Sequence, residues 1–230
     1  AAPGYPELAV KNLAELTGID FKNSEDLIAA TSDCGAYMTL SSAIKGLAVK
    51  MTKVCNDIRL LASGPRCGLK EINLPQLQPG SSIMPGKVNP VAAEVANQAS
   101  FLAIGLDTTV MLAASAGQLE LNVMEPVITY ALYTQMKVMT NACDTLRTKL
   151  VEGVTANTER CKDYVMNSIG IVTLLKPHFG YQKCAAIAKE GYTTGKSLHQ
   201  IVVDEQHLMT QAEWDATFNT QNLIHPKFVK

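Results

Sequence analysis

The chain has 230 residues, of which 47% are hydrophobic, 18% are charged and only 6% are aromatic, a composition that favours packed helices over sheets. With 20 basic and 21 acidic residues the net charge is -1, so the basic excess typical of a nucleic-acid surface is missing and we expect no nucleic-acid partner. No run of 18 apolar residues and no signal-peptide pattern occurs, and we therefore expect no membrane span.

The first third of the chain predicts helices. Residues 1–22 fit a short helix with flanking loops, and Asn23–Asp26 then supplies capping side chains for a helix that can run to Ala62. Apolar residues on this helix alternate spacings of three and four, as in the seam of a bundle, and we expect them to be core. They are Tyr37, Leu40, Ile44, Leu47, Met51, Val54, Ile58 and Leu61.

A long loop and two further helices follow. Residues 64–89 contain eight prolines and glycines, which break regular structure. Asn89 and Pro90 predict the N-cap and the first residue of a helix that runs to about Ala116. A third helix, over residues 121–152, repeats the seam pattern. Three such helices with further apolar positions indicate a bundle that is completed by helices of other chains.

After Gly153 the predicted helices become short. They fall near residues 158–168, 180–190, 197–205 and 210–218. Ser197 caps one of them, and Thr210 with Glu213 forms a capping box for another. We therefore expect an all-α chain in which residues 1–153 belong to a long-helix bundle and residues 154–230 form a small C-terminal helical domain.

The six cysteines and four histidines show no metal-binding pattern. No CxxC pair occurs, and the histidines have no metal-ligand spacing among themselves or with the cysteines. We expect free, buried thiols in a reducing cytosol and no metal site within this chain.

One segment, residues 80–90, carries the residue types of a site, and we call it the serine loop. Its sequence GSSIMPGKVNP holds two hydroxyls, one ammonium and one carboxamide. Gly80 and Gly86 permit close backbone approach, and the helix N-terminus that follows favours an anion, to which Lys87 adds a positive charge. These features suggest a carboxylate- or phosphate-binding loop, although composition alone also fits an ordinary capped loop.

Two well-known loop types do not fit the serine loop. A P-loop needs four residues between its glycines and a hydroxyl after the lysine, whereas Gly80 is followed by five residues before Gly86, and Val88 follows Lys87. A serine-hydrolase elbow, GxSxG, needs a second glycine where Met84 stands.

The serine loop resembles the GSSxxPxKxNP signature of the fumarase/aspartase superfamily at every specified position. The resemblance covers essentially the whole chain. In detail the sequence resembles the aspartate ammonia-lyases, although several stretches are shared with class II fumarases. The segments Thr31–Tyr37 and Gln221–Pro226 resemble the aspartate ammonia-lyases more than the fumarases. The stretches that carry the resemblance are residues 30–37, 55–61, 63–66, 71–75, 119–126, 167–173 and 221–226.

The resemblance implies a carbon–nitrogen lyase that converts L-aspartate reversibly to fumarate and ammonia. The proton leaves C3, and N–H and O–H donors with a cation stabilise the enediolate-like intermediate without a metal or other cofactor. Some members respond to divalent cations. The superfamily further implies a cytoplasmic homotetramer, with each active site assembled from three subunits and with a small domain that moves over it.

Within the serine loop the resemblance assigns a role to each polar residue. Ser81 is the general base, which requires that backbone amides and positive charge stabilise its oxyanion, with Gly80, Ser82 and other loop amides as the expected donors. Ser82 contacts a substrate carboxylate, Lys87 pairs with a carboxylate, and Asn89 hydrogen-bonds it.

Glu94, one turn into the following helix, matches a glutamate that orients a histidine; without the resemblance it would be interpreted as a solvated helix acid. That histidine and other substrate-binding residues lie in N-terminal segments that this sequence does not contain, so we expect the chain to be incomplete as an enzyme. Two alternatives stay open: a class II fumarase, which malate would distinguish from aspartate, and an inactive structural or oligomerising fragment, which adding the missing half would reveal.

Overall fold

The computed structural model describes residues 2–225, so the last residue of the stretch 221–226 lies outside it. Its regular structure is almost entirely helical, which confirms the expected all-α class. The chain divides into two compact units, residues 1–155 and 156–230. The sequence placed this boundary two residues earlier, after Gly153.

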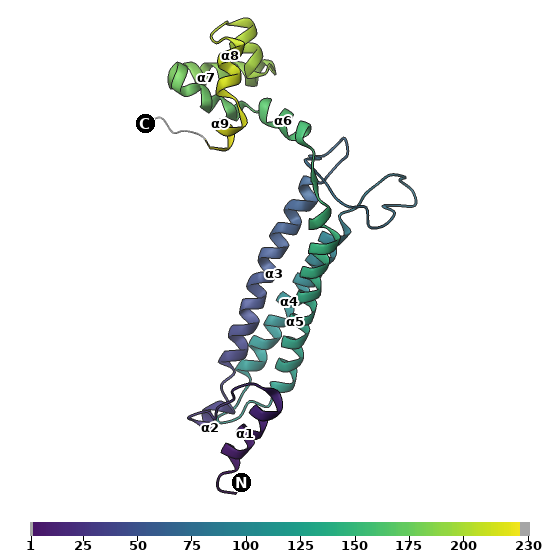
Figure 1. The fold of residues 1–230 in the computed structure, drawn as a ribbon, viewed down its shortest axis with the longest axis vertical. Coiled ribbons are helices and arrows are strands. Elements are labelled where there is room, and N and C mark those ends of the chain that lie inside the picture. Colours follow the sequence, from purple (N-terminus) through teal and green to yellow (C-terminus); the bar gives the residue numbers. More distant parts are fainter. Residues whose placement is uncertain (1, 226–230) are drawn as a thin grey trace. The chain divides into compact units, whose positions relative to one another are not determined.

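Three long helices dominate the first unit: α3 (Gly35–Leu61), α4 (Val91–Ser115) and α5 (Glu125–Lys149) (Figure 1). They pack side by side, with α4 in extensive contact with both of the others. Small residues on α4 let the helices approach closely, and larger apolar side chains from α3 and α5 fill the space between them. The fully buried members include Ala48, Cys55, Ala93, Ala96 and Ala103.

Short elements complete this unit. α1 (Tyr5–Thr17) lies at its N-terminal end, and the 3-10 turn η1 (Val151–Gly153) follows α5. β1 (Ile72–Asn73) pairs with β2 (Thr155–Ala156), and Thr155 is the last residue of the first unit.

The first long helix of the prediction is interrupted. α2 (Leu27–Ala30) stops four residues before α3 begins. In this break the Thr31 hydroxyl donates to the Glu120 carbonyl oxygen at 2.7 Å, and the Ser32 hydroxyl donates to that of Leu119 at 2.8 Å. These bonds tie the break to the turn between α4 and α5. The helix stops here because the Thr31 and Ser32 side chains bond to a distant part of the backbone. Local capping patterns in the sequence do not reveal such bonds.

The apolar stripe predicted as core on α3 is mostly open within this chain. Of its eight residues only Met51 is buried, whereas four are exposed: Tyr37, Leu40, Leu47 and Val54. The face that α3 buries carries Ser41, Ala48, Met51 and Cys55 instead. The prediction was wrong for the single chain because α4 and α5 cover only one flank of α3.

A carboxylate is buried between α3 and α4. Asp107 accepts hydrogen bonds from the Ser41 hydroxyl at 2.8 Å and from the Lys45 ammonium at 2.5 Å. Burial by itself raises the pKa of Asp107, but the hydrogen bonds from Lys45 and Ser41 outweigh it and hold that pKa below its usual value. The charge therefore stays on the carboxylate and pairs the two helices.

α4 is long and apolar enough to meet the length and hydropathy criterion for a membrane span, contrary to the expectation from apolar runs. The criterion is weak evidence, because the core helix of a bundle also meets it. α4 lies between two helices of the same unit and carries the Asp107 ion pair.

All six cysteines are free thiols, as expected. Burial raises the pKa of the Cys34, Cys55 and Cys184 thiols. The expectation that all are buried was wrong for Cys67, which is exposed in the loop after α3, and for Cys143 and Cys161, which are half-buried.

The second unit consists of short helices around one core that includes Leu175, Ile187, Ile201 and Trp214. Its helices are α6 (Thr158–Met166), η2 (Ile169–Leu175), α7 (Lys176–Thr194), the π-helix η3 (Gln200–Glu205), α8 (Gln211–Thr217) and α9 (Thr220–Ile224).

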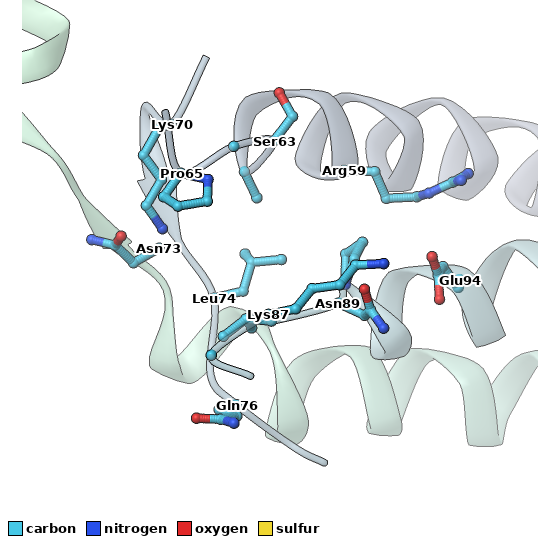
Figure 2. Close-up of a pocket in the computed structure, with 15 residues that line it drawn as sticks. Arg59, Ser63, Pro65, Lys70, Asn73, Leu74, Gln76, Lys87, Asn89 and Glu94 are labelled. Atoms are coloured by element: carbon cyan, nitrogen blue, oxygen red, sulfur yellow. The ribbon is translucent and has the colours of Figure 1, made fainter. Parts of the chain in front are cut away.

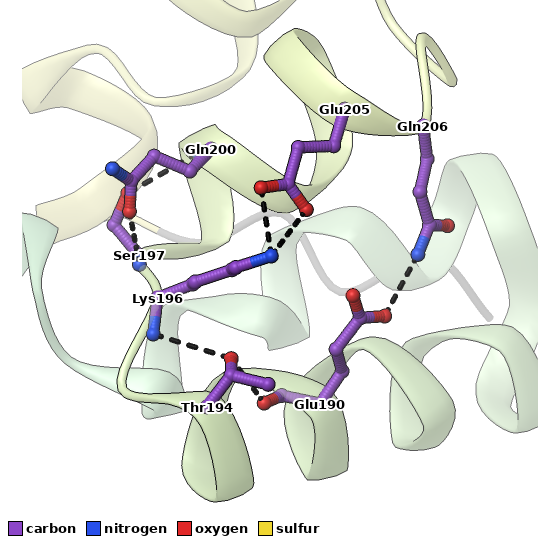
Figure 3. Close-up of polar contacts among 7 residues, drawn as sticks. All are labelled: Glu190, Thr194, Lys196, Ser197, Gln200, Glu205 and Gln206. Atoms are coloured by element: carbon purple, nitrogen blue, oxygen red, sulfur yellow. Dashed lines mark hydrogen bonds and ion pairs between the residues drawn. The ribbon is translucent and has the colours of Figure 1, made fainter.

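Predicted caps recur in this unit. The Ser197 hydroxyl accepts from the Gln200 amide at 3.2 Å, and the Thr210–Glu213 capping box is present. Lys196 bridges to both carboxylate oxygens of Glu205 at 2.8 Å, which fastens the turn after α7 to η3 (Figure 3).

Candidate functional site

The serine loop leaves and rejoins the bundle through a narrow neck. The Asn89 side-chain amide donates to the Gly80 carbonyl oxygen at 2.7 Å. A Cβ atom on Gly80 would lie 1.7 Å from the Lys87 carbonyl oxygen, so only glycine fits there. The prediction that Asn89 caps α4 was therefore wrong: the helix begins at Val91 without a side-chain cap, and Asn89 closes the loop instead.

Ser81 is held at the first turn of the loop. Its Oγ accepts hydrogen bonds from the Ile83 amide at 3.1 Å and from the Met84 amide at 3.3 Å. Both donors are backbone N–H groups aimed at the oxygen that would carry negative charge if the hydroxyl were deprotonated. The sequence named Gly80, Ser82 and other loop amides as candidate donors, and the amides that donate to the Ser81 oxygen in the structure are those of Ile83 and Met84. Ser82 is exposed beside them.

A cavity of about 550 Å³ lies in the first unit, where the end of α3, the following loop and the start of α4 meet. Its walls are polar and apolar in nearly equal parts, and the charged groups among them are three cations and one carboxylate (Figure 2). The polar lining residues that matter below are Arg59, Lys70, Asn73, Lys87, Asn89 and Glu94.

The structure brings together three of the predicted site residues. Lys87, Asn89 and Glu94 line the cavity, whereas Gly80, Ser81 and Ser82 are not part of its wall. Within residues 2–225 the side chains of Lys87 and Glu94 form neither an ion pair nor a hydrogen bond. Half of the predicted site residues thus line the same cavity, whereas Ser81 and Ser82 lie within the serine loop, outside the cavity wall.

Sequence reasoning did not assign a role to Arg59 or Lys70. Arg59 occupies the last turn of α3. A cation at a helix C-terminus is favoured by the helix dipole in any protein, so its charge alone gives no functional signal. Only the fold shows that this turn faces the start of α4.

Comparison with known proteins finds similarity to lyases along the chain. A lyase family model matches residues 1–105, and a fumarase C C-terminus model matches residues 171–225. Aspartate ammonia-lyase from Escherichia coli (strain K12) is 57% identical over 224 residues, which are 97% of this chain and 47% of that protein.

Solved structures show the same fold. Fumarate lyase:delta crystallin from Brucella melitensis is similar with a TM-score of 0.89 and 41% identity, over 94% of this chain and 47% of that one. Class II fumarase from Schistosoma mansoni gives a TM-score of 0.87 and 31% identity, over 99% of this chain and 50% of that one.

The chain thus spans about half the length of the relatives it matches, and it corresponds to their C-terminal part. The match extends over nearly the whole chain and includes the stretches on either side of the serine loop. The chain therefore belongs to the fumarase/aspartase superfamily of lyases.

Proposed function

We propose that this chain supplies the serine-loop part of an aspartate ammonia-lyase, which converts L-aspartate reversibly to fumarate and ammonia. The observation that carries the proposal is the Ser81 oxygen, which two backbone amides hold in a loop whose other arm brings Lys87 and Asn89 to a cavity with charged groups in its wall. The 57% identity to an aspartate ammonia-lyase supports aspartate over malate as the substrate.

Ser81 in its alkoxide form takes the proton from C3 of the substrate. The amides of Ile83 and Met84 lower the cost of that negative charge, because they are already directed at the oxygen before deprotonation. The electron pair of the broken C–H bond moves into the carboxylate next to C3 and forms the enediolate. When this intermediate collapses, C2 and C3 become doubly bonded, and the C2–N bond breaks with its electrons leaving on ammonia.

Lys87 and Asn89 bind a substrate carboxylate in this proposal, and Ser82 contacts one as well. One of the two N–H groups of the Asn89 side-chain amide donates to the Gly80 carbonyl oxygen, and the second N–H is the donor for the substrate carboxylate. Glu94 orients a histidine that another segment of the enzyme supplies. No residue of this mechanism requires a metal or an organic cofactor.

We also propose that the complete protein is a cytoplasmic homo-oligomer, a tetramer as in the superfamily. The exposed stripe on α3 supports this, since Leu40, Leu47 and Val54 lie on one long helix and stay exposed in the part of the chain that the structure describes. α4 exposes Phe101 and Leu112 in the same way. Helices of further subunits are the natural cover for such faces.

The test follows fumarate absorbance with L-aspartate, using this chain alone and then mixed with the N-terminal half of a related aspartate ammonia-lyase. We expect activity in the mixture and none with L-malate. Ser81→Ala in the mixture should reduce turnover by about 100-fold or more, the scale for losing a general base, while helix content stays unchanged. Activity with malate in place of aspartate would indicate a fumarase, and no activity with either substrate would indicate an inactive structural fragment.

A further inference from the structure

Arg59 and Lys70 are the two cations of the cavity that the proposed mechanism leaves unused, and Arg59 is the one that lies across from Glu94 (Figure 2). Arg59 extends from the last turn of α3, and Glu94 rises from the first turns of α4 on the opposite side of the same gap (Figure 2). Lys87 reaches the same region from the serine loop, so one carboxylate shares this space with two cations.

The Arg59 side chain is tied to the helix face that carries Glu94. The Asn56 Oδ1 atom accepts a hydrogen bond from Arg59 Nη1 at 3.4 Å and another from Asn97 Nδ2 at 2.8 Å. Asn97 is only 3% exposed and stands three residues after Glu94, on the same face of α4. Asn56 therefore connects the guanidinium on α3 to a buried, fixed point one turn from Glu94.

Lys87 and Glu94 carry opposite charges in the same cavity and would pair with each other unless a third charged group intervenes. Lys87 must be available to a substrate carboxylate, yet Glu94 is an anion in the same cavity and would neutralise it by forming an ion pair. Arg59 and Glu94 face each other across the gap, and within residues 2–225 no ion pair joins them. Arg59 is permanently protonated and has a planar set of donors that matches a carboxylate, so it competes with Lys87 as the counter-charge for Glu94.

We propose that Arg59 is a positioning residue that holds Glu94 away from Lys87, so that Lys87 remains free for the substrate carboxylate and Glu94 keeps one orientation. This inference rests on the proposed function for the role of Lys87. It concerns a residue that neither the serine-loop signature nor the mechanism above includes.

Kinetics of the mixed enzyme provide the first test. Arg59→Gln should raise KM for L-aspartate about tenfold, because Glu94 then pairs with Lys87, and Arg59→Lys should restore most of the loss. In the double variant Arg59→Gln/Glu94→Gln, KM should return to that of Glu94→Gln alone, since no carboxylate remains to occupy Lys87. A double variant whose KM is the product of both single effects would mean that Arg59 acts by itself, and the proposal would fail.

A second readout needs no lyase activity. In the 230-residue chain labelled with ¹³C at glutamate carboxyl groups, Arg59→Gln should move the Glu94 resonance, and adding Lys87→Met should reverse most of that movement. Lys53→Gln is the matched control, because Lys53 also lies on α3 but pairs with Asp57 on the exposed face. If the Glu94 resonance does not move in Arg59→Gln, the inference is refuted even when the mixed enzyme is active. If it responds while the mixture is inactive, the inference stands and the proposed function fails.

Discussion

Replacing Gly80 by alanine is expected to force open the neck of the serine loop. The new Cβ would lie 1.7 Å from the Lys87 carbonyl oxygen, and real Cβ contacts require at least 3.0 Å, so the two strands of the neck must separate. The 2.7 Å bond from Asn89 to the Gly80 carbonyl oxygen breaks in the process. Losing that bond costs about 0.5–1.5 kcal/mol of unfolding free energy, and overpacking adds about 1–3 kcal/mol where the backbone cannot relax.

Activity should suffer more than stability. Separation of the neck displaces Ser81 and Lys87 together, and a misplacement of about 1 Å at reacting groups costs on the order of 100-fold in rate. The assay is fumarate formation by the mixed enzyme, with urea unfolding of the chain followed by circular dichroism.

Gly46→Ala serves as the matched control for the Gly80 substitution. Gly46 lies within α3 on the side of Lys53, away from the apolar stripe, and a Cβ atom there meets no atom within 4 Å. Alanine should therefore leave turnover unchanged and raise stability by about 0.5–1 kcal/mol through its better helix propensity. If Gly80→Ala behaved like Gly46→Ala, with near-normal turnover, the closed neck would have no part in placing Ser81 and Lys87.

Further substitutions test other parts of the structure. Lys87→Met should raise KM for L-aspartate at least tenfold, as expected for losing a charged hydrogen bond, with a smaller change in kcat; an unchanged KM would remove its carboxylate role. Asp107 has a lowered pKa in the folded chain, so its contribution to stability is present above the unfolded pKa of about 3.9 and is lost as pH falls through the lower folded value. Asp107→Asn should flatten the acid limb of unfolding free energy against pH, and an unaltered limb would contradict the Lys45 pairing. Thr210→Ala should destabilise the second unit by about 1 kcal/mol through loss of the cap, and an unchanged midpoint in urea would show that α8 does not depend on it.

Local sequence patterns predicted the elements whose causes are local. Prolines and glycines marked the loop between α3 and α4, and the Thr210–Glu213 capping box appeared as expected because both partners lie within one turn. The three long helices also followed from their apolar periodicity.

The errors arose where a distant segment decides the outcome. The break at Thr31 and Ser32 depends on carbonyl oxygens nearly ninety residues away. Asn89 could have capped α4 through its side-chain oxygen, but its side chain instead donates from the amide nitrogen to the Gly80 carbonyl oxygen. Periodicity on α3 identified an apolar stripe correctly, yet it carries no information on whether the same chain or another one covers that stripe.

The candidate site shows the same division. Lys87 and Asn89 were recognisable from a linear signature, and Glu94 required the resemblance as well. The contribution of Arg59 depends on how α3 packs beside α4, because it lies more than thirty positions before Glu94 in the sequence. Spacing rules apply within one helix and cannot pair two residues across a turn of this length.

Because one hydrogen bond and one glycine close the serine loop, its positions should differ in how well they tolerate substitution. In this chain the Ile83 side chain is 87% exposed, and the contribution of Ile83 to Ser81 is its backbone amide, which nearly any residue type provides. Gly80 and Asn89 contribute features that other residue types lack. Substitutions of the Ile83 side chain should therefore leave the Ser81 oxygen in place, whereas substitutions at Gly80 or Asn89 should displace it.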